Sequence, residues 1–90
     1  MPPTTKTGII ILDANVLIAL CANEPKKPTA EKILEKYAKD GCDFYAPNII
    51  VAEVLYVLCQ KYQGGTLTKQ DYEKAVENFQ DQMMAVKTIN

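Results

Sequence analysis

The 90-residue chain contains no histidine and no arginine. Without histidine it has no imidazole to act as a general base, which excludes serine- and cysteine-type triads, and it has no histidine ligand for zinc. Without arginine it cannot hold a phosphate through a bidentate guanidinium group. Hydrolytic chemistry in this chain must therefore come from carboxylates with a metal ion, or from lysine or cysteine.

The charge balance and the cysteines narrow the class of protein further. The net charge is −1, so the chain lacks the basic surface that binds nucleic acid by charge alone. Cys21, Cys42 and Cys59 form no CxxC pair, which argues against a zinc site. The N-terminal segment has no secretory signal, and the apolar stretch 49–59 is too short to span a bilayer. We therefore expect a cytoplasmic protein with reduced thiols and no membrane partner.

Hydrophobic patterning predicts strands that alternate with helices. The apolar, β-branched run 9–12 predicts a strand covered on both faces. An aromatic strand is predicted at 43–46, and the tail 85–90 has the alternation of a third strand. Between and after these strands, helical patterns cover 16–20, 30–39, 48–62 and 69–83.

Capping residues indicate where the helices begin. Asn15 and Thr29 are expected to cap the first two helices, and Pro47 suits the first turn of the third. Thr68 and Asp71 form a capping-box pattern at the start of the fourth helix.

The order strand, helix, helix, strand, helix, helix, strand predicts an α/β fold with a parallel sheet. Right-handed crossovers would place helices on both faces, giving three α/β/α layers. No repeat or linker divides the chain. We therefore expect one domain over residues 1–90, with residues 1–7 as a flexible N-terminus.

Two carboxylates interrupt apolar elements. Asp13 ends the first strand, and Glu53 is the only polar residue between Ile49 and Cys59. Ligands bind at the carboxyl ends of parallel strands, and a carboxylate in an apolar setting needs a lysine, a backbone donor or a cation. If the two converge, their oxygens suit Mg²⁺ or Mn²⁺. The simpler alternatives are that Asp13 is a cap or turn residue and that Glu53 faces water.

The sequence around both carboxylates is similar to that of a known family. The string IILDANVLI at 10–18 resembles the opening of a PIN domain, as found in toxin ribonucleases of VapC type. The string YAPNIIVAEVL at 45–55 resembles the second acidic motif of that family. The spacing of the two motifs and the order of the elements also fit, and the resemblance covers residues 8–90.

The resemblance implies a Mg²⁺- or Mn²⁺-dependent nuclease that hydrolyses phosphodiester bonds of single-stranded RNA. Asp13 and Glu53 would be its catalytic, metal-ligating residues, and Asn15 would support Asp13 by hydrogen bonding. The remaining acidic residues of the family lie in a later helix and after a fourth strand. The chain is therefore expected to be the N-terminal half to two-thirds of the fold, truncated after about three strands and four helices, with weak metal affinity.

Three functions remain open from the sequence. The first is a PIN-like ribonuclease with RNA as its partner, or an inactive truncated remnant of one. The second is a non-catalytic PIN-like interaction module that acts as a homo-oligomer or binds an antitoxin protein. The third is an unrelated α/β domain in which Glu53 pairs with a lysine. In the PIN-like strand order the run 9–12 becomes an exposed edge strand, which favours an oligomer.

Overall fold

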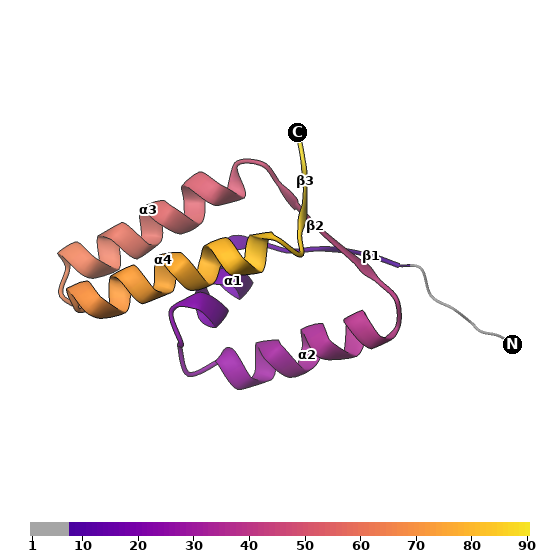
Figure 1. Ribbon diagram of the computed structural model, residues 1–90, viewed down its shortest axis with the longest axis horizontal. Helices are drawn as coiled ribbons and strands as arrows, with labels where there is room; N and C mark the ends of the chain where they lie inside the picture. The colour runs from indigo at the N-terminus through magenta and orange to yellow at the C-terminus, as the bar shows by residue number, and fades with distance from the viewer. Residues whose placement is uncertain (1–7) are drawn as a thin grey trace, which may run out of the picture.

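The computed structural model of the chain describes residues 8–90. Strands and helices alternate in the predicted order, which confirms the α/β fold (Figure 1). None of the helices in this part of the chain is long and apolar enough to cross a membrane. The prediction of a flexible N-terminus concerns residues 1–7, which lie outside the described residues. The elements are β1 (Ile9–Ile11), α1 (Ala14–Cys21), α2 (Lys27–Lys39), β2 (Asp43–Pro47), α3 (Ile50–Gln63), α4 (Lys69–Met83) and β3 (Lys87–Ile89).

The three strands form a parallel sheet in the order β1-β2-β3. Ile11 pairs with Tyr45, and the N–H of Leu12 donates to the carbonyl of Tyr45 at 2.8 Å. Pro47 is the last residue of β2, and its nitrogen carries no hydrogen to continue the ladder toward β1. The pairing of β1 therefore stops just before Asp13. Placing Pro47 in the third helix was wrong, because the strand extends through it.

The hydrophobic core surrounds α1. All residues from Leu17 to Cys21 are buried, and α1 packs against α2, α3 and α4. Figure 1 shows α3 and α4 side by side, with α2 across α1 from them. The longer helices contribute apolar stripes to this core, formed by Ile50, Val54 and Leu58 of α3 and by Ala75 and Phe79 of α4.

Side chains of β1 alternate between a covered and an open face. Ile10 and Leu12 belong to the core or pack against it, as does Ala46 of β2. Ile9 and Ile11 point to the other face and are 62% and 58% exposed. The prediction that this strand is covered on both faces is therefore wrong. Within residues 8–90, β1 is an edge strand, and a second helical layer over Ile9 and Ile11 is not seen.

The starts of the first two helices differ from the predicted caps. Asp13, not Asn15, caps α1: its backbone is extended and its Oδ1 accepts a hydrogen bond from the N–H of Val16 at 3.1 Å. Helix α2 begins before Thr29, with Pro28 in its first turn, and it has no side-chain cap. The proline decides this start, because its fixed φ suits the first turn of a helix.

The predicted cap of α4 is confirmed. Thr68 is extended, and its Oγ1 accepts a hydrogen bond from the N–H of Asp71 at 3.0 Å.

A glycine follows the C-terminal end of α2. Gly41 adopts a positive φ of 82°, which allows the chain to turn into β2.

We predict that Thr68→Ala lowers the free energy of unfolding by about 1 kcal/mol, because the N–H of Asp71 loses its acceptor. Thr29→Ala is the matched control, since Thr29 caps no helix, and its effect should stay within about 0.5 kcal/mol. Urea unfolding followed by circular dichroism measures both. Equal losses in the two variants would contradict the assignment of the cap.

Burial governs the chemistry of Cys21. This residue is buried in α1, and loss of hydration raises the pKa of its thiol from 9.0 to about 11. Cys42 and Cys59 are partly exposed, and all three thiols are free. The thiolate is the reactive form, so the three cysteines should differ in reactivity.

We predict that iodoacetamide at pH 8 modifies Cys42 and Cys59 while Cys21 stays unmodified. A pKa of about 11 leaves roughly 100-fold less thiolate than a pKa of 9, and burial adds a steric barrier. Peptide mass spectrometry measures the modification of each cysteine. In urea all three should react alike, and equally fast reaction of Cys21 in the folded protein would contradict the prediction.

Candidate functional site

Asp13 stands at the carboxyl edge of the sheet, directly after the last paired residue of β1. Its side chain is exposed, although its Oδ1 accepts a hydrogen bond from the N–H of Val16. It forms no ion pair with a lysine of residues 8–90. The carboxylate is thus oriented by the helix that it caps and still has an oxygen free for a ligand.

Glu53 lies in the first turn of α3, which begins shortly after β2 ends. The sequence placed it in an apolar environment, but its side chain is exposed. The reason is that α3 buries one stripe, along Ile50 and Val54, while Ile49 and Tyr56 on its other side remain exposed. Its charge is stabilised by the amino end of the helix, and it has no ion pair within the described part of the chain.

The topology brings both carboxylates to the same edge of the sheet. β1 and β2 are adjacent and parallel, so their carboxyl ends lie side by side. Asp13 follows the first of these strands, and the helix that carries Glu53 follows the second. Parallel α/β sheets bind ligands at this edge, so the position suits a functional site.

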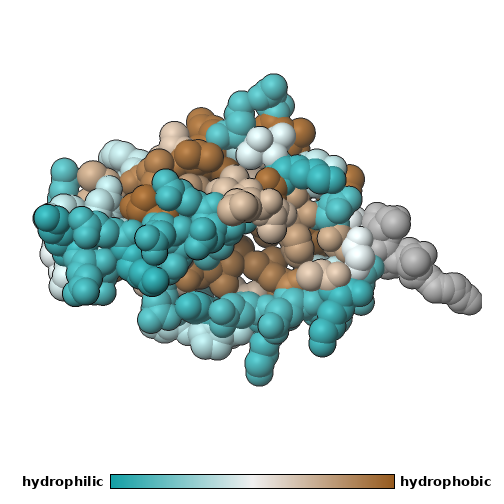
Figure 2. All heavy atoms as spheres, in the orientation of Figure 1, coloured by the Kyte–Doolittle hydropathy of each residue, from teal (hydrophilic) through white to brown (hydrophobic). Residues whose placement is uncertain are grey.

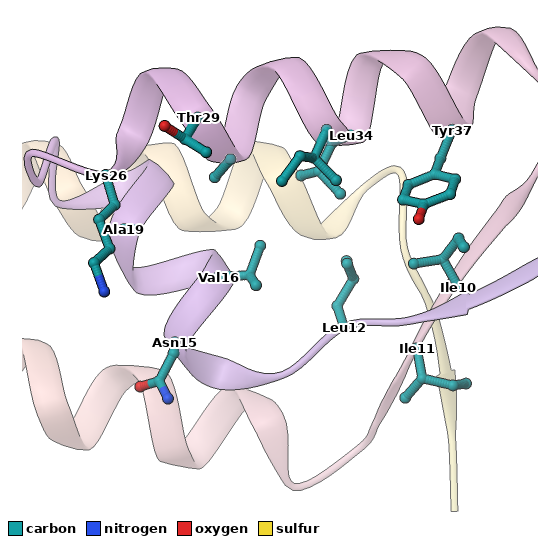
Figure 3. A pocket seen from close by; sticks show the side chains of 12 residues that line it. Ile10, Ile11, Leu12, Asn15, Val16, Ala19, Lys26, Thr29, Leu34 and Tyr37 are labelled. Carbon is teal, nitrogen blue, oxygen red and sulfur yellow. The ribbon is translucent and has the colours of Figure 1, made fainter.

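Asn15 lies in the first turn of α1 beside this edge. Figure 3 shows its side chain directed toward α3, away from α2. It lines a cavity of about 520 Å³ between the loop after α1 and α3, which Lys26 also lines. Glu24 and Lys61 face each other in this cavity and form an ion pair at 3.0 Å. A groove with both polar and apolar side chains in its lining therefore runs from Asn15 along α3.

Two asparagines that the sequence analysis did not single out also lie at this edge. Asn48 follows β2 and Asn90 follows β3, and Nδ2 of Asn48 donates to Oδ1 of Asn90. The backbone N–H of Asn48 donates to the carbonyl of Ile89 at 2.8 Å. A polar residue directly after each strand was the available signal, because the ends of parallel strands meet at one edge.

The side-chain oxygens at this edge are of the type that binds a hard cation. Carboxylate and amide oxygens are the ligands that Mg²⁺ and Mn²⁺ prefer. Within residues 8–90, no three histidine, cysteine, aspartate or glutamate side chains gather into a metal-binding group. Asp13 and Glu53 would therefore hold an ion whose remaining ligands are mostly water.

Comparison with known protein families matches residues 10–89 to the PIN domain. The chain belongs to the PIN domain family. PIN domains are nuclease-type domains that generally depend on divalent metal ions. The match extends from β1 to β3 and includes both Asp13 and Glu53. No curated protein matches this PIN domain.

We predict that two substitutions separate the structural role of Asp13 from its charge. Asp13→Asn keeps a capping oxygen, so the free energy of unfolding should change by less than about 0.5 kcal/mol. Asp13→Ala removes the cap and should lower it by about 1 kcal/mol. Urea unfolding measures both variants. Equal destabilisation would show that the charge, and not the hydrogen bond to Val16, stabilises α1.

Proposed function

We propose that the carboxyl edge of the sheet is the divalent-metal site of a ribonuclease, with Asp13 and Glu53 as ligands. The observation that carries this proposal is their placement. Two exposed carboxylates follow adjacent parallel strands, and neither is neutralised by a lysine of residues 8–90. Their side chains are thus free to bind a cation from solution.

The chemistry of this chain favours phosphodiester hydrolysis assisted by Mg²⁺ or Mn²⁺. With no histidine and no arginine, the side chains alone offer neither an imidazole base nor a guanidinium clamp. A divalent ion supplies an activated water and neutralises charge on the phosphate. Asp13 is oriented for this role by the N–H of Val16.

Single-stranded RNA is the substrate that the surroundings of the edge support. The groove beside Asn15 is lined by Lys26, which can contact a phosphate as a point charge, and by Lys61, which forms an ion pair with Glu24. Figure 3 shows Lys26 extending away from α2 on the side of Asn15. An extended strand would lie along this groove, with Asn15 between the lysines and the two carboxylates.

The affinity for the metal ion should be weak, and the ion should bind between Asp13 and Glu53. We expect the carboxylates of Asp13 and Glu53 to lie within about 5–8 Å of each other, the span of a shared hydrated ion. Since water fills most of the shell, little of the ion's hydration is replaced by protein ligands. Weak affinity is therefore the expected result.

A non-catalytic interaction module is the second candidate. The small number of carboxylates at the edge and the exposed apolar side chains, Ile9, Ile11, Ile49 and Tyr56, favour it. Such a module would act as a homo-oligomer or bind another protein, such as an antitoxin. Metal binding and RNA cleavage separate the two candidates.

The first test is a Mn²⁺ titration followed by NMR. The paramagnetic ion should broaden the signals of residues near Asp13 and Glu53 before any others. Asp13→Asn and Glu53→Gln should each weaken this effect at least roughly tenfold, since each removes one of two charged ligands. Asp40→Asn and Glu73→Gln are the controls, because they remove exposed carboxylates elsewhere. Broadening that ignores Asp13→Asn would contradict the proposed site.

The second test is cleavage of a fluorogenic single-stranded RNA with Mg²⁺ or Mn²⁺. We expect slow cleavage that EDTA and Asp13→Asn both abolish. Asp13→Asn is the informative variant because it should retain the cap of α1. Metal binding without cleavage would favour the interaction module over the nuclease.

A further inference from the structure

The exposed face of α3 carries an aromatic side chain next to a candidate metal ligand. Glu53, Tyr56 and Gln60 are all exposed and follow one another at intervals of three and four residues. That spacing places the three side chains on one face of the helix, apart from the buried stripe of Ile50 and Val54. Tyr56 therefore lies one turn beyond Glu53, about 4.5 Å further along the helix axis.

On the surface of α3, Glu53 lies between the groove beside Asn15 and Tyr56. Each residue turns an α-helix by about 100°. Val57, which lines that groove, is thus about 40° from Glu53 in one direction, and Tyr56 is about 60° from it in the other. A strand that crosses Glu53 from the groove next meets Tyr56.

Tyr56 differs from other tyrosines of the chain in what its ring contacts. The ring of Tyr62 stacks on that of Tyr72, with 4.9 Å between the centroids. Lys87 lies over the ring of Tyr45, 5.5 Å from its centroid. Tyr56 is 64% exposed, and within residues 8–90 no aromatic ring or lysine stacks on it. Its ring is therefore free to contact a ligand with a flat face.

A hydrogen bond holds the side chain of Tyr56 on this face. Nε2 of Gln60, one turn later, donates to the hydroxyl oxygen of Tyr56 at 2.9 Å. Because the oxygen is the acceptor, the hydroxyl hydrogen can still be donated to a ligand. A side chain that is already held also loses less rotamer freedom on binding.

The surroundings of Tyr56 suit a nucleic-acid base better than a phosphate. Gln60 and Gln63 continue the exposed face without a charge. Figure 2 shows apolar side chains over the first half of α3, where Ile49 and Val51 are exposed. The positive charge of Lys26 lies instead at the groove, on the far side of Glu53 from Tyr56. Phosphates are therefore favoured in the groove and a base on the exposed face of α3.

We propose that Tyr56 is a base-stacking residue, whose ring packs on the base of a nucleotide adjacent to the phosphate at the metal ion. This role rests on the proposed function, because the ion held by Asp13 and Glu53 places that phosphate. Single-stranded RNA suits the position, since its unpaired bases can turn outward and stack on aromatic side chains. Stacking accepts every base, so Tyr56 contributes affinity and positioning and does not select the sequence.

Access to Glu53 implies access to Tyr56. A substrate must reach the ion at Glu53 from solvent, and Tyr56 lies one turn away on the same exposed face. The stacking position is therefore open to the same strand that reaches the ion.

The test compares two ligands that have the same phosphates. One is a short single-stranded oligouridine, and the other is an abasic ribose-phosphate strand of equal length. Binding to the full chain is measured with Mg²⁺ by fluorescence anisotropy, before slow cleavage cuts the strand. Tyr56→Leu should weaken binding of the oligouridine about tenfold and leave binding of the abasic strand unchanged, because only the first ligand can stack.

Two variants serve as controls. Tyr56→Phe keeps the ring and should bind the oligouridine within about twofold of the wild type. Tyr37→Leu removes an exposed tyrosine from α2 and should change neither affinity. Circular dichroism checks that each variant folds, which the exposure of both tyrosines favours. Equal weakening of both ligands by Tyr56→Leu would contradict stacking, because the abasic strand offers no base.

The outcomes separate this role from the proposed function. If Asp13→Asn and Glu53→Gln weaken RNA binding but Tyr56→Leu does not, the metal site stands and stacking at Tyr56 is refuted. If the wild-type chain binds neither ligand, both are refuted. Sedimentation velocity supplies the remaining comparison: self-association that Tyr56→Leu abolishes while RNA binding is unchanged would assign Tyr56 to a protein interface instead.

Discussion

The burial of α1 is the constraint on which the other features depend. Its residues from Leu17 to Cys21 are removed from water, and each of the other helices packs against it. Leu12 and Asp13 alone separate this helix from β1. Burying the helix therefore fixes the carboxyl end of the strand, and the cap that begins the helix is also the first candidate ligand. Core and site are positioned by the same short segment.

The parts of the fold that the sequence predicted rest on local signals. The order of the elements follows from hydrophobic periodicity, and Thr68 was identified from its spacing to Asp71. Asn15 and Thr29 were wrong as caps because neighbouring candidates compete, although Asp13 had been considered as a cap or turn residue. Asp13 and Asn15 are equally good caps by residue type. Helix α2 begins before Thr29 because Pro28, one position earlier, suits the first turn of a helix.

What the sequence could not supply is which face of an element is covered. A continuous apolar run is the same whether a strand is central or at an edge, so the exposure of Ile9 and Ile11 depends on neighbours far along the chain. Glu53 was correctly placed in the third helix, but its exposure follows from the narrow stripe that α3 buries. Asn48 and Asn90 become neighbours when β2 and β3 pair.

The lack of buried residues in α2 has a consequence for local stability. A segment that buries little apolar surface opens with a lower free energy than the rest of the fold. Backbone amides of α2 should then exchange through local opening, whereas those of α1 require global unfolding. Helix α2 forms one wall of an apolar cavity that β1 and α1 also line. Any molecule that fills this cavity would therefore also stabilise α2.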